Sequence, residues 1–140
     1  MKTILTAAAA VLALAAPAFA QDEIAGDIKA GGKDWKKCKA CHAITDPDGE
    51  KIEKGGKTGP NLWGVVGRQA GTDPEFGKYT DEMTALGEGG LEWTPEELGK
   101  YIPNAKEYIG AKTAMTPQKL KDVNNVIAFL AQYGPEEAAE

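Results

Sequence analysis

Apolar residues recur at helical spacing near the end of the chain, in the clearest pattern of the sequence. The stripe consists of Leu120, Val123, Val126, Ile127, Leu130 and Tyr133. A threonine cap followed by proline at the first helical position, Thr116 and Pro117, precedes the stripe, and Gly134 follows it. Spacings of three and four positions place one apolar face toward a core. The pattern predicts an amphipathic helix over residues 116–134.

A second helix is predicted by its start signal. Thr94 is followed by Pro95 and, three positions after the cap, by Glu97. This arrangement is a capping box with proline at the first helical position. Because proline cannot continue a helix, Pro103 should end this one near Ile102.

A third helix is predicted over residues 27–40, starting at Gly26 or Asp27. The pair Gly31 and Gly32 lies inside it, where each glycine costs about 1 kcal/mol relative to alanine. Glycines at these positions are explained if another element packs closely against that face.

The remaining pattern contains one short helix and long loops. Thr80 or Asp81 can cap a helix over residues 80–86, whereas residues 45–68 and 67–78 show no alternation typical of strands. We therefore expect an all-α fold of four or five helices. Loops this long in a small domain usually surround a bound group.

The first twenty residues have the features of a secretory signal peptide. Lys2 precedes an apolar run over residues 4–14, and Ala18-Phe19-Ala20 forms a small-x-small cleavage site. The run is shorter than the roughly 20 apolar residues of a membrane span. We expect residues 1–20 to be removed on export to the periplasm, an uncleaved anchor being the alternative.

Removing these 20 residues from the 140 leaves one domain, residues 21–140, with a short acidic tail over residues 134–140. The segment removed contains Lys2 and no acid, so the net charge changes from −5 to −6. This charge argues against nucleic-acid binding. No later apolar stretch reaches membrane length, so the exported chain is expected to be soluble.

Both cysteines and the only histidine lie within one five-residue segment, Cys38-Lys39-Ala40-Cys41-His42. This is the C-x-x-C-H spacing of covalent haem c attachment. Two thiols three positions apart can form thioethers to neighbouring vinyl groups, and the next imidazole then faces the iron. The motif predicts one haem c, attached through Cys38 and Cys41, with His42 as proximal ligand.

Three other uses of this motif are less consistent with the sequence. A disulfide between Cys38 and Cys41 would close a very small loop and add little stability. A dithiol oxidoreductase would place the pair after a strand in an alternating strand–helix chain, which the pattern does not indicate. A zinc site would need more soft ligands than two cysteines and one histidine provide.

The sixth iron position has several candidates. With one histidine in the chain, a bis-histidine haem is excluded, leaving Met83, Met115, a lysine or an open site. Met83 lies in a helical stretch, where methionine is commonly a core residue. Met115 is favoured because small residues and Pro117 surround it in a loop. Histidine–methionine ligation would leave no site for substrate, and hence favours electron transfer over catalysis.

A second motif supports a family resemblance. The segment Lys57-Thr58-Gly59-Pro60-Asn61-Leu62-Trp63-Gly64-Val65-Val66-Gly67-Arg68 resembles the K-T-G-P-N-L-x-G-x-x-G-R signature of class I c-type cytochromes, specifically the bacterial cytochrome c2 and c550 group. The likeness extends over residues 26–133. It implies the class I cytochrome c fold around one covalent haem, with the methionine ligand at Met115 and Met83 on a helix beside the haem.

The resemblance also implies roles for individual residues. The carbonyl of Pro60 would accept the second N–H of the proximal imidazole, and Tyr101 would lie in the haem crevice. Trp35 would contact Phe129 between the first and last helices. Three donors are implied as partners of the haem propionates: Arg68, Tyr79 and Trp93.

The resemblance implies a monomeric, soluble periplasmic one-electron carrier that is not an enzyme. Its donor would be a cytochrome bc1 complex, and its acceptor a photosynthetic reaction centre, a terminal oxidase or a denitrification enzyme. The alternative is a ligand-binding or peroxidatic haem protein with a labile sixth ligand. Lysines expected near the haem edge would dock on acidic partner surfaces, although a solvated mixed surface is the simpler interpretation. These lysines are Lys36, Lys37, Lys39, Lys54, Lys57, Lys106 and Lys112.

Overall fold

The computed structural model describes residues 24–135, which fold into five α-helices, one 3-10 helix and one two-stranded sheet. The elements are α1 (Ile28–Asp34), η2 (Trp35–Lys37), β1 (Ile44–Thr45), β2 (Lys51–Glu53), α2 (Asp81–Glu88), α3 (Pro95–Tyr101), α4 (Ala105–Ile109) and α5 (Val123–Leu130). The predicted signal peptide and most of the acidic tail lie outside the described residues. Within those residues, no helix is both long and apolar enough to cross a membrane.

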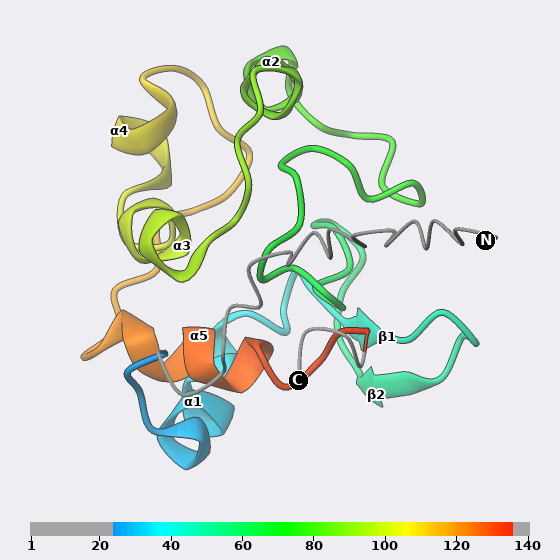
Figure 1. Ribbon diagram of the computed structural model, residues 1–140, viewed down its shortest axis with the longest axis vertical. Coiled ribbons are helices and arrows are strands. Elements are labelled where there is room, and N and C mark those ends of the chain that lie inside the picture. The colour runs from blue at the N-terminus through cyan, green and yellow to red at the C-terminus, as the bar shows by residue number, and fades with distance from the viewer. Residues whose placement is uncertain (1–23, 136–140) are drawn as a thin grey trace, which may run out of the picture.

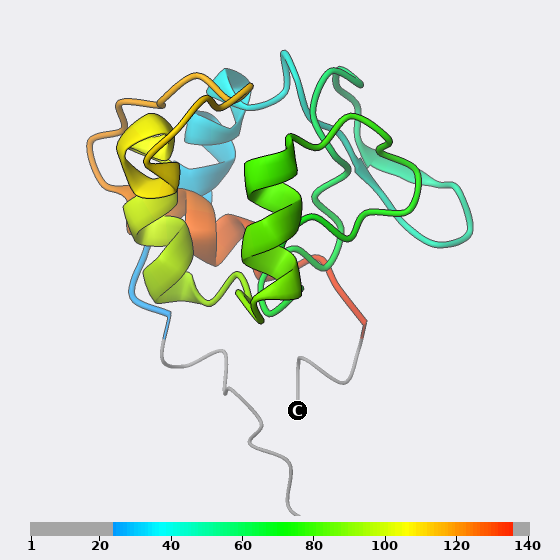
Figure 2. The same cartoon turned by 90° about the horizontal axis from the view of Figure 1, so that it is seen from above.

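The helices enclose a single apolar core. Figure 1 shows α1 and α5 together at one end of the molecule, α2 at the opposite end, and α3 and α4 along one side. The view from above in Figure 2 shows α2 standing across from α3 and α4. The predicted all-α class with long loops is confirmed, with a small sheet added to it.

The crossing of α1 over α5 confirms the prediction that the glycines accept a close neighbour. A Cβ atom at Gly31 would lie 2.0 Å from the carbonyl oxygen of Asn125, so only glycine fits. Asp27 caps α1, its side chain accepting the N–H of Ala30 at 2.9 Å. The α-helix ends at Asp34 and one 3-10 turn follows, so the helix is shorter than predicted.

The last helix begins later than its sequence predicts. α5 starts at Val123, and the side chain of Asp122 caps it by accepting the N–H of Asn124 at 3.0 Å. Residues 116–122 are not helical, and the N–H of Gln118 donates to the carbonyl of Ile102 at 2.9 Å instead. The threonine and proline therefore do not start the helix, because their segment bonds across to the end of α3.

The start of α3 agrees with its prediction, but the capping box is half formed. The hydroxyl of Thr94 accepts the N–H of Glu97 at 3.2 Å, and the helix ends at Tyr101 with Ile102 as its cap. The carboxylate of Glu97 does not return to Thr94, because it accepts from Lys100 and from the hydroxyl of Tyr108. α2 is capped by Thr80 as predicted and extends two residues further.

Three elements were missed by the sequence pattern: α4, β1 and β2. α4 is a five-residue helix that ends at Gly110, whose φ of +70° lies in the left-handed region that favours glycine. β1 and β2 pair antiparallel, Ile44 with Glu53, around a turn. All three elements are too short for a periodic pattern to appear.

Candidate functional site

A cavity of about 430 Å³ lies among η2, α2, α3, α4, α5 and the loops between them. All nine residues predicted to bind the haem are on its wall: Cys38, Cys41, His42, Pro60, Arg68, Tyr79, Trp93, Tyr101 and Met115. These residues span 78 positions from Cys38 to Met115 when both ends are counted, so only the fold brings them together.

The two cysteines and the histidine share one turn of backbone. The N–H of Cys41 and the N–H of His42 both donate to the carbonyl of Cys38, at 3.1 and 3.0 Å. Cys38 is half-buried, Cys41 is exposed, and no disulfide joins them. Burial raises the pKa of the Cys38 thiol to about 11, so it is protonated at neutral pH when free. The turn offers two thiols and an imidazole to the same cavity.

His42 is held in the form that a metal requires. Its Nδ1 lies 2.7 Å from the carbonyl oxygen of Pro60. A carbonyl can only accept, so Nδ1 carries the proton and Nε2 remains free as a ligand atom. Burial is the largest influence on the pKa of His42 and lowers it, which favours the neutral ring. A Cβ at Gly59 would lie 2.4 Å from Cε1 of this ring, so the ring rests directly against the backbone.

The segment that carries Met115 is tied down at several points. The N–H of Met115 donates to the hydroxyl of Thr113 at 3.2 Å. Further along, Lys37 Nζ donates to the carbonyl of Lys119 at 2.9 Å. Met83 also lines the cavity, from α2, and is buried. Both predicted methionine candidates therefore belong to the wall.

A polar cluster closes another part of the wall. Nη1 of Arg68 donates to the carbonyls of Asn61 and Trp63 at 3.0 and 3.1 Å. The hydroxyl of Tyr79 accepts the N–H of Asp73 at 3.2 Å. Burial lowers the pKa of Arg68 and raises that of Tyr79. The cluster combines the half-buried cation of Arg68 with the buried carboxylate of Asp73 on adjoining loops.

The residues present fit a haem. Arg68 Nε is buried and has no hydrogen-bond partner among the described residues. Because an unpaired buried donor is costly, a carboxylate of the cofactor would satisfy it. Most of the remaining wall is apolar, as a porphyrin requires. His42 and Met115 could supply nitrogen and sulfur ligands to its iron. No cluster of three His, Cys, Asp or Glu side chains that could hold a metal occurs in the described part of the chain.

An aromatic group extends from the cavity toward the surface. The ring centroids of Trp93 and Tyr101 are 4.7 Å apart, and those of Tyr101 and Tyr108 are 5.6 Å apart. The hydroxyl of Tyr108 donates to the carboxylate of Glu97. Burial first, and then this hydrogen bond, raise the pKa of Tyr108 to about 12. The rings fix one side of the cavity to α3 and α4.

Sequence reasoning missed three polar residues of the site. Asn61 bonds to Thr45 through its side chain, Asp73 is buried beside Tyr79, and Thr113 bonds to the hydroxyl of Tyr101. Asn61 lies inside the signature segment, which could have identified it. Asp73 and Thr113 lie in loops without a distinctive pattern, so their sequence context carried no signal.

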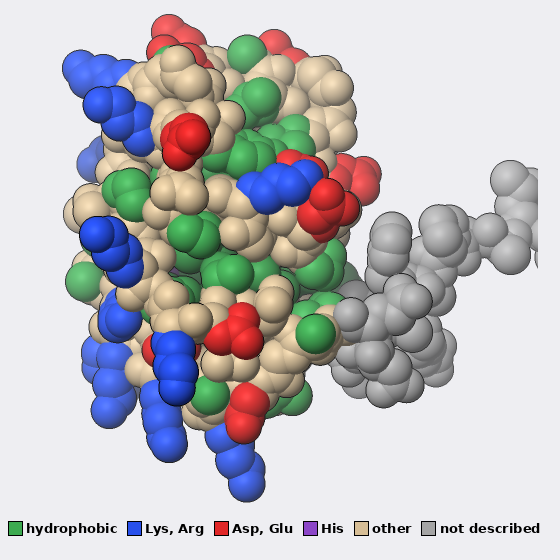
Figure 3. Space-filling view, turned by 90° about the vertical axis from the view of Figure 1, so that its left-hand side faces the viewer, with side chains coloured by type: hydrophobic (Ala, Val, Ile, Leu, Met, Phe, Trp, Pro, Cys, Tyr) green, Lys and Arg blue, Asp and Glu red, His purple; other side chains and the backbone are tan. Residues whose placement is uncertain are grey.

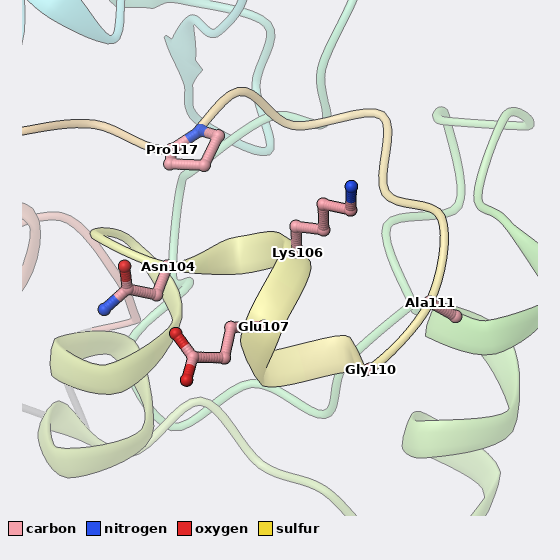
Figure 4. A pocket seen from close by; sticks show the side chains of 6 residues that line it. All are labelled: Asn104, Lys106, Glu107, Gly110, Ala111 and Pro117. Atoms are coloured by element: carbon pink, nitrogen blue, oxygen red, sulfur yellow. The ribbon is translucent and has the colours of Figure 1, made fainter.

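All seven lysines expected near the cavity are exposed: Lys36, Lys37, Lys39, Lys54, Lys57, Lys106 and Lys112. Figure 3 shows basic side chains gathered along one edge of the molecule. Lys37 lines the cavity itself. Lys106 lies at a second, open hollow of about 520 Å³ beside α4, where Figure 4 shows it directed away from Glu107.

The fold and this cavity define a class of protein, a small helical c-type haem protein. Comparison with models of protein families gives no match. The chain is 49% identical to cytochrome c2 of Rhodobacter capsulatus over 139 residues, covering 94% of this chain and 97% of that protein. It is 43% identical to cytochrome c-550 of Paracoccus denitrificans over 149 residues, covering 100% and 94%.

Solved structures agree with the sequence relatives. Ferric cytochrome c-550 from Paracoccus versutus superposes with a TM-score of 0.74 at 42% identity, covering 79% of this chain and 100% of that one. The chain belongs to the cytochrome c2 and c-550 family of class I c-type cytochromes. It is therefore a haem-containing electron carrier rather than an enzyme.

Proposed function

We propose that this protein is a periplasmic one-electron carrier whose haem is attached through Cys38 and Cys41 and ligated by His42 and Met115. The observation that supports the proposal is that both thiols, the imidazole and the methionine line the same cavity. The haem supplies an iron centre that takes up and releases a single electron.

The protein side chains hold that centre in one arrangement. His42 presents Nε2 because Nδ1 is bonded to the Pro60 carbonyl. Thr113 and the bonded segment that follows Met115 hold the backbone that carries the methionine side chain. Arg68, whose Nε is buried and without a hydrogen-bond partner among the described residues, would donate to a haem propionate. A site held this firmly needs little rearrangement when the charge on the iron changes.

The proposal extends to partners and location. Cys41 is exposed, so the cysteine side of the cavity faces solvent. Lys36, Lys37 and Lys39 flank Cys38 in the sequence and are exposed as well. A basic rim of this kind suits brief docking on acidic surfaces. By family resemblance the donor is a cytochrome bc1 complex, and the acceptor is a reaction centre, terminal oxidase or denitrification enzyme. The signal-like residues 1–20 support export.

Absorption spectra of the ferric and ferrous protein test the ligands. Met115→Ala should abolish the weak far-red band of sulfur-ligated ferric haem, whereas Met83→Ala should retain it. The two variants form a matched pair because both side chains line the same cavity. Retention of haem by the denatured protein on a gel tests the covalent attachment.

The opposite outcomes point to the competing function. A far-red band that survives in Met115→Ala but disappears in Met83→Ala would assign the ligand to Met83. Rapid carbon monoxide binding by the untreated ferrous protein would indicate an open or labile sixth position. That result would favour a ligand-binding or peroxidatic haem protein over a carrier.

A further inference from the structure

Asp73 is the one buried residue with a charged or polar side chain in the described part of the chain, being 8% exposed. No lysine or arginine forms a salt bridge with it in that region, where the two ion pairs both involve Lys100. A carboxylate buried in this way is costly unless its oxygens are bonded. Both oxygens of Asp73 do accept hydrogen bonds, and the two donors show what the residue does.

One oxygen has a local role. Oδ1 accepts the backbone N–H of Glu75 at 3.1 Å, two residues further on. This hydrogen bond forms a common type of turn within a loop, and such a turn does not require a buried carboxylate. The other oxygen, Oδ2, accepts the backbone N–H of Asn61 at 2.8 Å, twelve residues earlier in the chain. Asp73 thus reaches out of its own loop to a segment of the haem site.

The N–H of Asn61 belongs to the same peptide group as the carbonyl of Pro60. That carbonyl accepts from Nδ1 of His42 at 2.7 Å. The described residues contain no cis peptide, so the N–H and the carbonyl point to opposite sides of the group. One peptide unit therefore bonds to the Asp73 carboxylate on one side and to the proximal imidazole on the other.

Hydrogen bonds in such a chain strengthen one another. A carboxylate that accepts a peptide N–H pushes electron density toward the carbonyl oxygen, which becomes a better acceptor. A stronger bond at Nδ1 gives the imidazole more anionic character and makes it a better donor to a metal. Ferric iron gains more from this than ferrous iron does.

We propose that Asp73 is a positioning residue for His42, acting through the Pro60–Asn61 peptide group to stabilise the oxidised state of the carrier. The proposal rests on His42 being the proximal ligand, as set out under the proposed function. Arg68 supports the arrangement, because its Nη1 holds the carbonyl of Asn61 at 3.0 Å. The segment is thereby fixed at the N–H of Asn61 and again at its carbonyl.

Asp73→Asn removes the charge but keeps an oxygen that can accept from Asn61. The matched control is Glu75→Gln, which removes an exposed charge two residues away. It leaves intact the hydrogen bonds that connect Asp73 to His42 through the Pro60–Asn61 peptide group. Potentiometry on the holoprotein should show the Asp73→Asn equilibrium shifted toward the ferrous form by about three- to tenfold, where tenfold corresponds to 59 mV for one electron. Glu75→Gln should shift it by less than twofold.

A charge acting through space would also raise the potential, so a second readout is needed. In the ferrous protein, the nuclear magnetic resonance signal of the His42 Nδ1–H should move to lower frequency in Asp73→Asn and exchange with solvent about tenfold faster, as expected for a weakened hydrogen bond. Glu75→Gln should leave this proton unchanged. A ring N–H that behaves identically in both variants overturns the inference, even if the potential moves.

The wild-type protein provides a test that no folding defect can obscure. A scalar coupling across the hydrogen bond should connect the Asn61 amide nitrogen to the side-chain carboxyl carbon of Asp73, and its absence overturns the inference. Failure of the proposed function is distinguishable. It would appear as the loss of histidine–methionine spectral features in the wild type, whereas failure of this inference leaves those features intact.

Discussion

At the scale of single residues, the site depends on contacts that exclude even one methyl group. Gly59 lies against the imidazole of His42, with the position of a Cβ 2.4 Å from Cε1 and 2.8 Å from Nδ1. A real Cβ atom essentially never lies within 3.0 Å of a non-bonded atom. The glycine of the signature segment is thus explained by the ring that it supports.

Gly59→Ala should push the ring away from the Pro60 carbonyl and weaken the proximal bond. We expect a loss of about 1–3 kcal/mol in the free energy of unfolding, the usual cost of overpacking. Gly77→Ala is the control, because a Cβ there meets nothing within 4 Å. Denaturant unfolding of both holoproteins measures the difference, and equal stabilities would show that the ring is not in contact with residue 59.

Tyr108 gives a prediction for alkaline pH. Its pKa is raised to about 12, first by burial and then by its bond to Glu97, from an ordinary value of 10. A group whose pKa is raised by folding contributes stability that is fully present below its unfolded pKa. That stability is lost as the pH rises through the folded value.

The unfolding free energy of the wild type should therefore decline between pH 10 and about 12 by more than that of Tyr108→Phe, which lacks the ionisable group. Thermal unfolding followed over this range checks the difference. Curves that remain parallel for the two proteins would show that Tyr108 is not protonated preferentially in the folded state.

At the scale of elements, the crossing of α1 and α5 is the contact that shapes one end of the molecule. Trp35 and Phe129 pack with ring centroids 6.0 Å apart, as the family resemblance implied. The neighbouring glycines have different surroundings. A Cβ at Gly31 would meet the Asn125 carbonyl, whereas one at Gly32 would lie 3.4 Å from the ring of Phe129.

Gly31→Ala should separate the two helices and destabilise the protein by about 1–3 kcal/mol or more. Gly32→Ala removes a glycine from the same helix in ordinary contact, so it should be neutral or stabilise by up to about 1 kcal/mol. Guanidinium unfolding midpoints of the pair measure this. The close crossing would be refuted if both variants shifted the midpoint equally.

At the scale of the whole molecule, charge is distributed unevenly. The formal net charge is −5, yet basic side chains gather along one edge in Figure 3. An acidic protein with a basic edge can approach an acidic partner in a preferred orientation, with an attraction that salt screens.

Electron transfer to a purified acidic partner complex should slow as ionic strength rises, and Lys39→Gln should slow it severalfold at low salt. Lys100→Gln is the control, since Lys100 already bonds to Glu96 and Glu97 at 2.7 and 3.1 Å. Stopped-flow rates at several salt concentrations decide the matter. A rate indifferent to ionic strength would remove the docking role of these lysines.

The amino-acid sequence by itself determined the haem motif, the caps of α2 and α3, and the family. These features are local, because their chemistry depends on spacings of a few residues: two thiols and an imidazole in five positions, or a threonine three residues before the N–H that it caps. The helix stripe of α5 was also visible, but its start was predicted too early, at Thr116 and Pro117 instead of Val123. Residues 116–122 do not continue the helix because the N–H of Gln118 donates to the carbonyl of Ile102, a tertiary contact that the local sequence does not reveal.

Only the tertiary structure decided which polar residues support the site. Asp73 is twelve residues from Asn61 along the chain, and nothing in its loop distinguishes a buried carboxylate from an exposed one. The short sheet and α4 were missed because elements of two to five residues have no period. Long-range hydrogen bonds and burial are properties of the folded chain, since they depend on which loops the packed helices bring together.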